Sequence, residues 1–95
     1  MEISISSNVA IITGNIKSVS DFQNIKSSID SLITTHKNII IELQDSISIT
    51  SSVIGYFNKL VLKDKIDLHL RISNDQLMAL LDDLNLASVL KARKV

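Results

Sequence analysis

The sequence contains no cysteine and no proline, and its 95 residues include only two glycines, two phenylalanines and one tyrosine. Without cysteine the chain has neither a disulfide framework nor a thiolate nucleophile, as is common in a reducing compartment. Gly14 and Gly55 are too few and too far apart for a P-loop or a Rossmann phosphate turn, so nucleotide binding by these motifs is excluded. The core must therefore come from Ile, Leu and Val, within a hydrophobic content of 45%.

Ten basic side chains balance ten acidic ones, which gives a formal net charge of zero. Such a chain lacks the positive field on which nucleic-acid binding depends, and we expect no nucleic-acid partner. The aliphatic runs, residues 39–41 among them, are far shorter than the roughly 20 residues of a membrane helix, so we expect no membrane span. Residues 1–7 show neither a basic leader nor a continuous apolar stretch, which predicts a cytoplasmic protein without a signal peptide.

A chain of this length has room for one hydrophobic core, so residues 1–95 are predicted to form a single domain. Ile3 and Ile5 alternate with polar residues, a polar turn follows at residues 6–8, and residues 9–12 resume an extended pattern, which predicts two antiparallel strands. Gly14 ends the second strand. There we expect either a positive φ or a neighbour that leaves no room for a Cβ atom.

Helical spacing begins after the second strand, with apolar residues three and four positions apart. Two serines are candidates for the N-cap of this helix. Ser18 has Asp21 three residues later and Ser20 has Gln23, so each could form a capping box.

Residues 39–43 form a β-branched run without alternation, which predicts a central strand covered by helices on both faces. A polar connection follows at residues 46–50, with Ile47 and Ile49 expected to turn inward. Helical spacing returns from Ser51.

Strict alternation at residues 66–72 predicts a strand with one buried and one solvated face. Ser73 with Gln76 offers a capping box for a third helix. Residues 87–95 fit either the end of that helix or a short edge strand. The expected fold is an α/β domain with a mixed sheet in the order β-β-α-β-α-β-α, with helices packed on the sheet.

Few residues are suited to catalysis or to metal binding. His36 and His69 have no cysteine or carboxylate at ligand spacing, so we expect no metal and no cofactor. Glu42, at the end of the central strand, is expected to be a capping carboxylate rather than part of a ligand site, and Asp82 and Asp83 to face solvent. Because no nucleophile and base evidently converge, we expect no enzymatic activity.

The spacing of two segments is specific. Residues 39–43 have the sequence Ile-Ile-Ile-Glu-Leu, and eight positions after the glutamate, residues 50–55 have Thr-Ser-Ser-Val-Ile-Gly. This pattern resembles the STAS family, the domain shared by sulfate transporters and anti-sigma factor antagonists. In that family an aliphatic strand ends in an acidic residue, and Asp-Ser-Ser-Gly-Leu-Gly opens a helix eight positions later. Residues 9–16 and 66–86 resemble other parts of the same domain, so nearly the whole chain is covered.

The resemblance implies a regulatory module that docks onto another protein. The partner surface it implies consists of Thr50, Ser51, Ser52, Val53 and Gly55. Ser51 and Ser52 are candidates for phosphorylation, and Ser51 is expected at the N-cap or in the first turn of its helix. Thr50 replaces the family's aspartate and Val53 its first glycine, the pair that flanks the phosphorylated serine.

Two kinds of partner fit this resemblance. One is an anti-sigma factor kinase or another signalling protein. The alternative makes the chain a phosphorylation-independent accessory subunit that binds the ATPase of a lipid-transport complex.

Overall fold

A computed structural model describes residues 1–47 and 49–95, and in this part of the chain eight elements follow one another. They are β1 (Glu2–Ser6), β2 (Val9–Thr13), α1 (Val19–Leu32), β3 (Asn38–Gln44), α2 (Ser51–Leu62), β4 (Asp67–Ile72), α3 (Asp75–Asp83) and β5 (Ala92–Lys94). This is the predicted order with one further strand at its end. The α/β fold and the mixed sheet are therefore confirmed.

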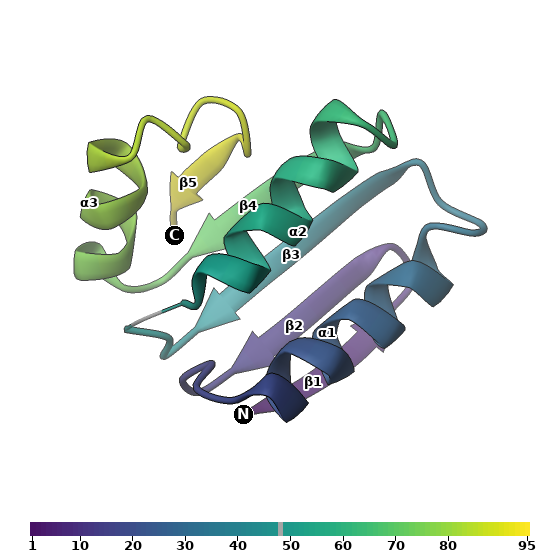
Figure 1. Ribbon diagram of the computed structural model, residues 1–95, viewed down its shortest axis with the longest axis horizontal. Coiled ribbons are helices and arrows are strands. Elements are labelled where there is room, and N and C mark those ends of the chain that lie inside the picture. The colour runs from purple at the N-terminus through teal and green to yellow at the C-terminus, as the bar shows by residue number, and fades with distance from the viewer. Residues whose placement is uncertain (48) are drawn as a thin grey trace.

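The strands lie in the sheet in the order in which they occur along the chain, from β1 at one edge to β5 at the other (Figure 1). β1 and β2 form the predicted antiparallel hairpin, while β3, β4 and β5 each pair in parallel with the preceding strand. A parallel pair needs a crossover connection, and α1, α2 and α3 lie in these crossovers. The radius of gyration, 11.9 Å, is that of one compact domain of this length.

Helix α1 begins with the first of its two predicted capping boxes. The hydroxyl of Ser18 accepts a hydrogen bond from the N–H of Asp21 at 3.1 Å, and the Asp21 carboxylate accepts one from the N–H of Ser18 at 3.3 Å. A further hydrogen bond from the N–H of Lys17 to this carboxylate is the largest cause of the lowered pKa of Asp21. Ser20 lies inside the helix.

Helix α3 is capped one residue later than predicted. Asn74 is the N-cap, and its side chain accepts a hydrogen bond from the N–H of Leu77 at 3.0 Å. The hydroxyl of Ser73 instead donates to the carbonyl of Leu43 at 3.2 Å and accepts from the N–H of Asp45 at 3.1 Å. The prediction of Ser73 as the cap was wrong because these contacts to the end of β3 bind its hydroxyl.

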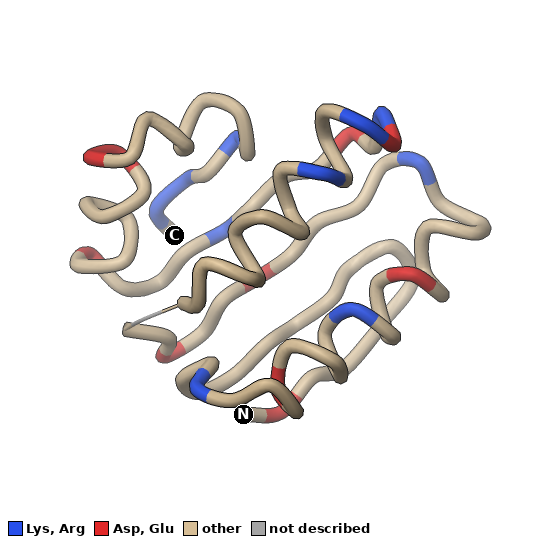
Figure 2. The backbone as a smooth tube through the Cα atoms, in the orientation of Figure 1, with Lys and Arg blue, Asp and Glu red and all other residues tan. Residues whose placement is uncertain are grey.

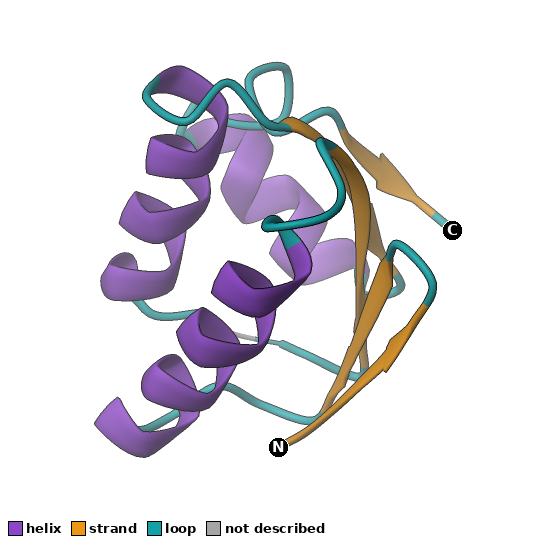
Figure 3. Ribbon diagram, turned by 90° about the vertical axis from the view of Figure 1, so that its right-hand side faces the viewer, coloured by secondary structure: helices purple, strands orange, loops and turns teal. Residues whose placement is uncertain are grey.

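The described helices all pack on the same face of the sheet, and the other face is open (Figure 3). Burial alternates along β3: Ile39, Ile41 and Leu43 are buried beneath the helices, whereas Ile40 and Glu42 point to the open face and are partly exposed. The prediction that β3 is covered on both faces was therefore wrong. Successive right-handed crossovers that advance in one direction keep their helices on one side of a sheet.

The core lies between this sheet face and the helices. Its largest fully buried side chains are Phe57, Ile12, Ile16, Ile25, Ile29, Ile39, Ile41, Leu43, Leu60, Leu68, Leu70 and Ile72. In the connection to α2, Ile49 packs against the core as expected, but Ile47 is 53% exposed and does not turn inward. Ser48, also in this predicted connection, lies outside the described residues.

The last segment combines a turn with an edge strand. Leu90 is fully buried in the turn that follows α3, and the strand β5 begins only at Ala92. β5 pairs with β4 in parallel, with Ala92 beside Leu70 and Lys94 beside Ile72. Of the two predictions for this segment, the short edge strand is the one observed.

Because helices cover only one face of the sheet, alanine substitutions at two neighbouring positions of β3 should lower the free energy of unfolding by different amounts. Ile41→Ala should destabilise the domain by about 2–5 kcal/mol, because it leaves a cavity under the helices. Ile40→Ala should cost less than half as much, since its side chain is partly exposed on the open face. Guanidinium unfolding curves of the two variants measure the difference, and equal losses would contradict the burial pattern.

Candidate functional site

The carboxyl ends of β2, β3 and β4 meet at one edge of the sheet, where the chain leaves each strand for the start of a helix (Figure 1). In an α/β sheet this edge is where ligands and partners commonly bind. Two of its loops are joined by hydrogen bonds. The hydroxyl of Ser46 donates to the carbonyl of Gly14 at 2.7 Å, and the N–H of Ile47 donates to the side chain of Asn15 at 2.8 Å. The loop that leads to α2 is thus fastened to the loop that leads to α1.

Gly14 has the positive φ expected for it, +84°. Its N–H donates to the carbonyl of Gln44 at 3.0 Å, so the turn begins while the chain is still bound to the neighbouring strand. A Cβ atom at this position would lie 3.5 Å from the backbone of Met1, which is an ordinary contact. Backbone conformation rather than crowding therefore favours glycine here.

The first turn of α2 presents two exposed serines. Thr50 is the N-cap, and its hydroxyl accepts a hydrogen bond from the N–H of Val53 at 3.3 Å. Ser51 is the first helical residue, which agrees with its predicted place in the first turn, and both Ser51 and Ser52 are exposed. Because Thr50 forms the cap, the hydroxyls of both serines remain at the surface.

The five residues of the predicted partner surface do not all reach solvent. Val53 is fully buried in the core beneath α2, so its side chain contributes no surface at which a partner could bind. Gly55 is exposed, and nothing lies within 4 Å of the place where a Cβ atom would stand. The accessible part of the predicted surface consists of Ser51, Ser52 and Gly55, together with Thr50 at its border. We call this the α2 start surface.

The α2 start surface carries no charged side chain of its own. α1 has Asp21 and α3 has Asp75 in the first turn, but α2 has no acidic residue there and no charged residue before Lys59 (Figure 2). The free N–H groups at a helix N-terminus carry a partial positive charge. At α2 no side chain of its first turn offsets this charge.

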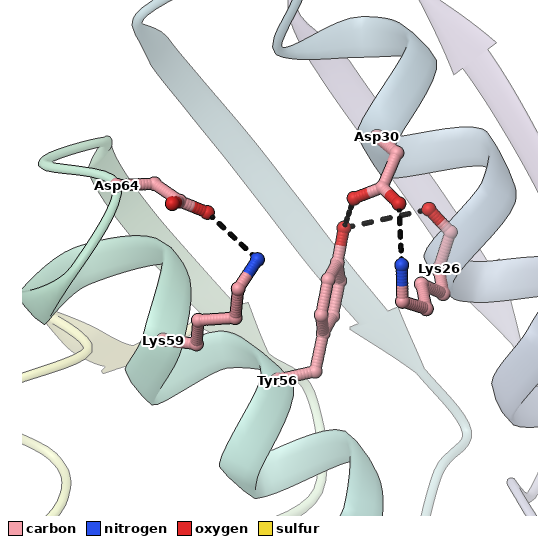
Figure 4. Close-up of polar contacts among 5 residues, drawn as sticks. All are labelled: Lys26, Asp30, Tyr56, Lys59 and Asp64. Atoms are coloured by element: carbon pink, nitrogen blue, oxygen red, sulfur yellow. Dashed lines mark hydrogen bonds and ion pairs between the residues drawn. The ribbon is translucent and has the colours of Figure 1, made fainter.

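A polar cluster holds α2 against α1 one turn further along (Figure 4). The hydroxyl of Tyr56 donates to the Asp30 carboxylate at 2.5 Å, and the ammonium of Lys26 donates to the same carboxylate at 2.7 Å. The ring of Phe22 meets the ring of Tyr56 edge-on, with 6.2 Å between the centroids. The helix that carries the two serines is thus anchored in a fixed position.

The polar cluster shifts the pKa values of its two central groups. Partial burial, followed by the hydrogen bond to Asp30, raises the pKa of Tyr56 well above its usual range, so its hydroxyl stays protonated and donates. Partial burial acts to raise the pKa of Asp30, but the hydrogen bonds from Lys26 and Tyr56 outweigh it, and the pKa is lowered. Asp30 therefore remains ionised at neutral pH.

The other residues considered in the sequence lie apart from one another. Glu42 does not cap a backbone end as predicted; its carboxylate lies on the open sheet face, 3.4 Å from the guanidinium of Arg71 on β4. His36 contacts the hydroxyl of its neighbour Thr35, and His69 lies 3.2 Å from Asp67. Within residues 1–47 and 49–95, no three His, Asp or Glu side chains come close enough to hold a metal ion.

The described helices include none that is both long and apolar enough to cross a membrane.

The structure brings together two basic residues that the sequence did not link. Arg71 and Arg93 lie side by side on the open face of the sheet, next to a hollow on that face. The alternation of residues 66–72 places Arg71 on a solvated face. No comparable signal exists for Arg93, because its strand has only three residues.

No protein-family model matches this chain, and no curated protein matches it in sequence. Among solved structures, the chain is similar to the NMR structure of the protein TM1081, with a TM-score of 0.68 and 18% sequence identity. The match covers 98% of this chain and 79% of that one. At this identity the likeness concerns the fold alone, and it supports the compact α/β arrangement described above.

The two glycines should respond in opposite directions to the same substitution. Gly14→Ala should destabilise the domain by about 1–2 kcal/mol, because alanine is strained at positive φ. Gly55→Ala should stabilise it by roughly 0.5–1 kcal/mol, because α2 gains a better helix former in open space. Thermal or urea unfolding measures both, and a shift of the same sign in the two variants would contradict the assigned roles.

Tyr56→Phe should lower stability at neutral pH by roughly 0.5–1.5 kcal/mol through loss of the hydrogen bond to Asp30. Because the pKa of Asp30 is lowered in the folded state, its stabilisation is fully present above the unfolded value of 3.8 and is lost as the pH falls through the lower folded value. The variant, which lacks one cause of that shift, should lose less stability on acidification.

Urea unfolding at pH 7 and at a series of lower pH values compares the two proteins. A constant difference between them across this range would show that Asp30 and Tyr56 are not coupled.

Proposed function

We propose that this chain is a non-catalytic regulatory interaction module of the STAS type, which docks onto a protein partner through the α2 start surface. The observation that carries the proposal is the exposure of Ser51 and Ser52 in the first turn of α2 while Thr50 supplies the cap. The sequence resemblance to anti-sigma factor antagonists centres on these same residues.

The shape of the α2 start surface suits close contact with a partner. Its residues are small, and above Gly55 the space is open, so a partner's backbone can approach the helix. Just before the helix, Ile47 is 53% exposed on the loop fastened to Asn15. A partner that covers this region would bury the apolar side chain of Ile47 beside a surface without charged side chains, and charged residues are depleted at the core of protein interfaces.

Phosphorylation of Ser51 is the regulatory step that we propose for this surface. A phosphoserine brings a charge of about −1.5 to −2 to the positive end of a helix whose first turn has no acidic residue. The free N–H groups of that turn favour an anion. The added charge would change what the surface binds without disturbing Val53 and the core beneath it.

A second candidate is an accessory subunit that binds the ATPase of a transporter and works without phosphorylation. The observation that favours it concerns Thr50, which keeps the capping hydrogen bond to Val53 but lacks the negative charge of the aspartate found in the family. A kinase that recognises the negative charge of this aspartate would find an uncharged threonine at position 50 of this chain. The docking surface is the same in both candidates, and only the switch differs.

Docking at the α2 start surface is tested with Gly55→Gln, which adds a long side chain in open space, and with Ala79→Gln on the exposed side of α3 as the matched control. Each tagged variant is used to recover partners from the source cells, and the recovered proteins are compared with those of the parent chain. We expect Gly55→Gln to lose the main partner and Ala79→Gln to retain it. Retention by both variants would place docking elsewhere.

Phosphorylation is tested on the protein isolated from its own cells, by mass spectrometry of the peptide that contains Ser51 and Ser52. We expect phosphate on Ser51, and we expect Ser51→Asp to lose a partner that Ser51→Ala retains. If phosphate is absent under every growth condition and both variants recover the same partner, the switch is excluded. Recovery of a transporter ATPase in that case would favour the second candidate.

A further inference from the structure

The sheet has an open face opposite the helices (Figure 3), and the register of its strands determines which side chains lie next to one another there. Strand pairing places Ile11, Glu42, Arg71 and Arg93 side by side in one row across β2, β3, β4 and β5. The neighbouring row runs through Val9, Ile40 and His69. Val9, Ile11 and Ile40 thus make the face mainly apolar over β2 and β3, where Glu42 is the exception. Over β4 and β5 the face carries Arg71 and Arg93, with Asp67 at the start of β4.

The apolar part of this face lacks a covering layer. Val9, Ile11 and Ile40 are partly exposed, although they lie on neighbouring parallel strands in the middle of the sheet. Parallel strands occur almost always with helices on both faces, because both sides of such strands tend to be apolar. Among the described residues no helix lies on this side, so this part of the face is left open.

The basic part of the face borders a hollow of about 620 Å³. The hollow is lined by Asn8, Asn38, Ile40, His69, Leu70, Arg71, Lys91, Arg93, Lys94 and Val95. Four of these residues are Lys or Arg, out of ten in the whole chain, and none of the described lining residues is Asp or Glu. On a chain whose net charge is zero, this concentration of positive charge marks a place for an anionic partner.

The basic side chains of this face can still bind an anionic partner, although some of them form ion pairs within the domain. Lys91 pairs with Asp67 at 2.6 Å, Arg71 with Glu42 at 3.4 Å and Lys94 with Asp75 at 3.4 Å, but all six side chains remain at least partly exposed. Exposed pairs of this kind are weak and exchange readily with other anions. Arg93 is exposed and forms no ion pair with the described residues.

We infer that the open face binds an acidic amphipathic helix of a partner protein, whose apolar side covers Val9, Ile11 and Ile40 and whose carboxylates meet Arg71 and Arg93. A helix is the element that normally covers parallel strands, and its carboxylates complement the basic row. Addition of a strand at β5 is disfavoured because that edge is only three residues long and carries charged side chains. Pairing of the face with a second copy would bring the basic rows of both copies to one interface.

The test uses two synthetic 18-residue amphipathic helices that share the same leucine face and differ only in carrying glutamate or lysine on its flanks. Each is titrated into the ¹⁵N-labelled protein, and amide shifts are followed by NMR. We expect the glutamate peptide to bind at least tenfold more tightly than the lysine peptide and to shift amides of the open face, Ile40, His69 and Arg93 among them. Binding should weaken as salt is added.

A charge reversal with a matched control completes the experiment. Arg93→Glu should weaken binding of the glutamate peptide about fivefold to tenfold, because an exposed attraction becomes a repulsion. Lys17→Glu makes the same change of charge just before α1, away from the open face, and should leave binding unchanged. Both positions are exposed and neither side chain is buried in the core, so both variants should fold.

Several results would overturn the inference. In the peptide titration they are an absence of amide shifts on the open face at millimolar peptide, shifts confined to the α2 start surface, or equal affinity for the two peptides. In the variant experiment, it is an equal effect of Arg93→Glu and Lys17→Glu on binding of the glutamate peptide. Open-face shifts that depend on protein concentration without peptide would assign the face to a second copy of the chain. Docking at Gly55 is tested with other variants and by recovery of partners from cells, so failure of one proposal is distinguishable from failure of the other.

Discussion

From β2 to β5 each crossover carries the chain one strand further in the same direction, and each adds its helix to the same side of the sheet. A right-handed crossover leaves no other arrangement for strands in this order, because only a reversal of direction would bring a helix to the opposite face. The core is consequently one layer between helices and sheet, and β3 is buried on one side only. Because the described helices all lie on one face, the opposite face of the sheet stays open. The helix N-termini lie along the carboxyl ends of the strands.

This one-sided arrangement separates two surfaces of different character. At the carboxyl edge of the sheet, the loops before α1 and α2 are joined through Ser46 and Asn15, and they present the small, uncharged α2 start surface. On the reverse side, the sheet itself presents an apolar area beside Arg71 and Arg93. The two proposed partners, one at the α2 start surface and one at the open face, would therefore bind to different parts of the domain.

Local signals in the sequence were sufficient for much of the fold. Neighbours within a few residues were enough to predict three features of the fold. These are the capping box of Ser18 and Asp21, the half-buried strand at residues 66–72 and the start of α2 at Ser51. The first turn of α2 was predicted in the same way, with its serines at the surface. These features depend on hydrogen bonds and periodicity along one segment, which a single sequence displays directly.

The errors arose where distant segments decide the outcome. The hydrophobic pattern could not show that Ile40 lies on an uncovered face of the sheet. An apolar residue at this position is compatible with a strand covered on both faces and with a strand covered on one. Ser73 and Asn74 are both good caps, and only the contact of Ser73 with the end of β3 selects Asn74. The pairing of Glu42 with Arg71 likewise requires the register of β3 against β4, which joins residues 29 positions apart.

The anchoring of α2 determines how a change at its start would be transmitted. Val53, Phe57 and Leu60 are fully buried beneath the helix, and the hydroxyl of Tyr56 ties its middle to Asp30 on α1. A charge added at Ser51 meets the free N–H groups of the first turn and leaves these contacts intact. Since none of these contacts involves the side chain of Ser51, the proposed modification would alter the chemistry of the surface while the backbone stays in place. In so small a domain, regulation through a local change of charge preserves the single core on which its stability depends.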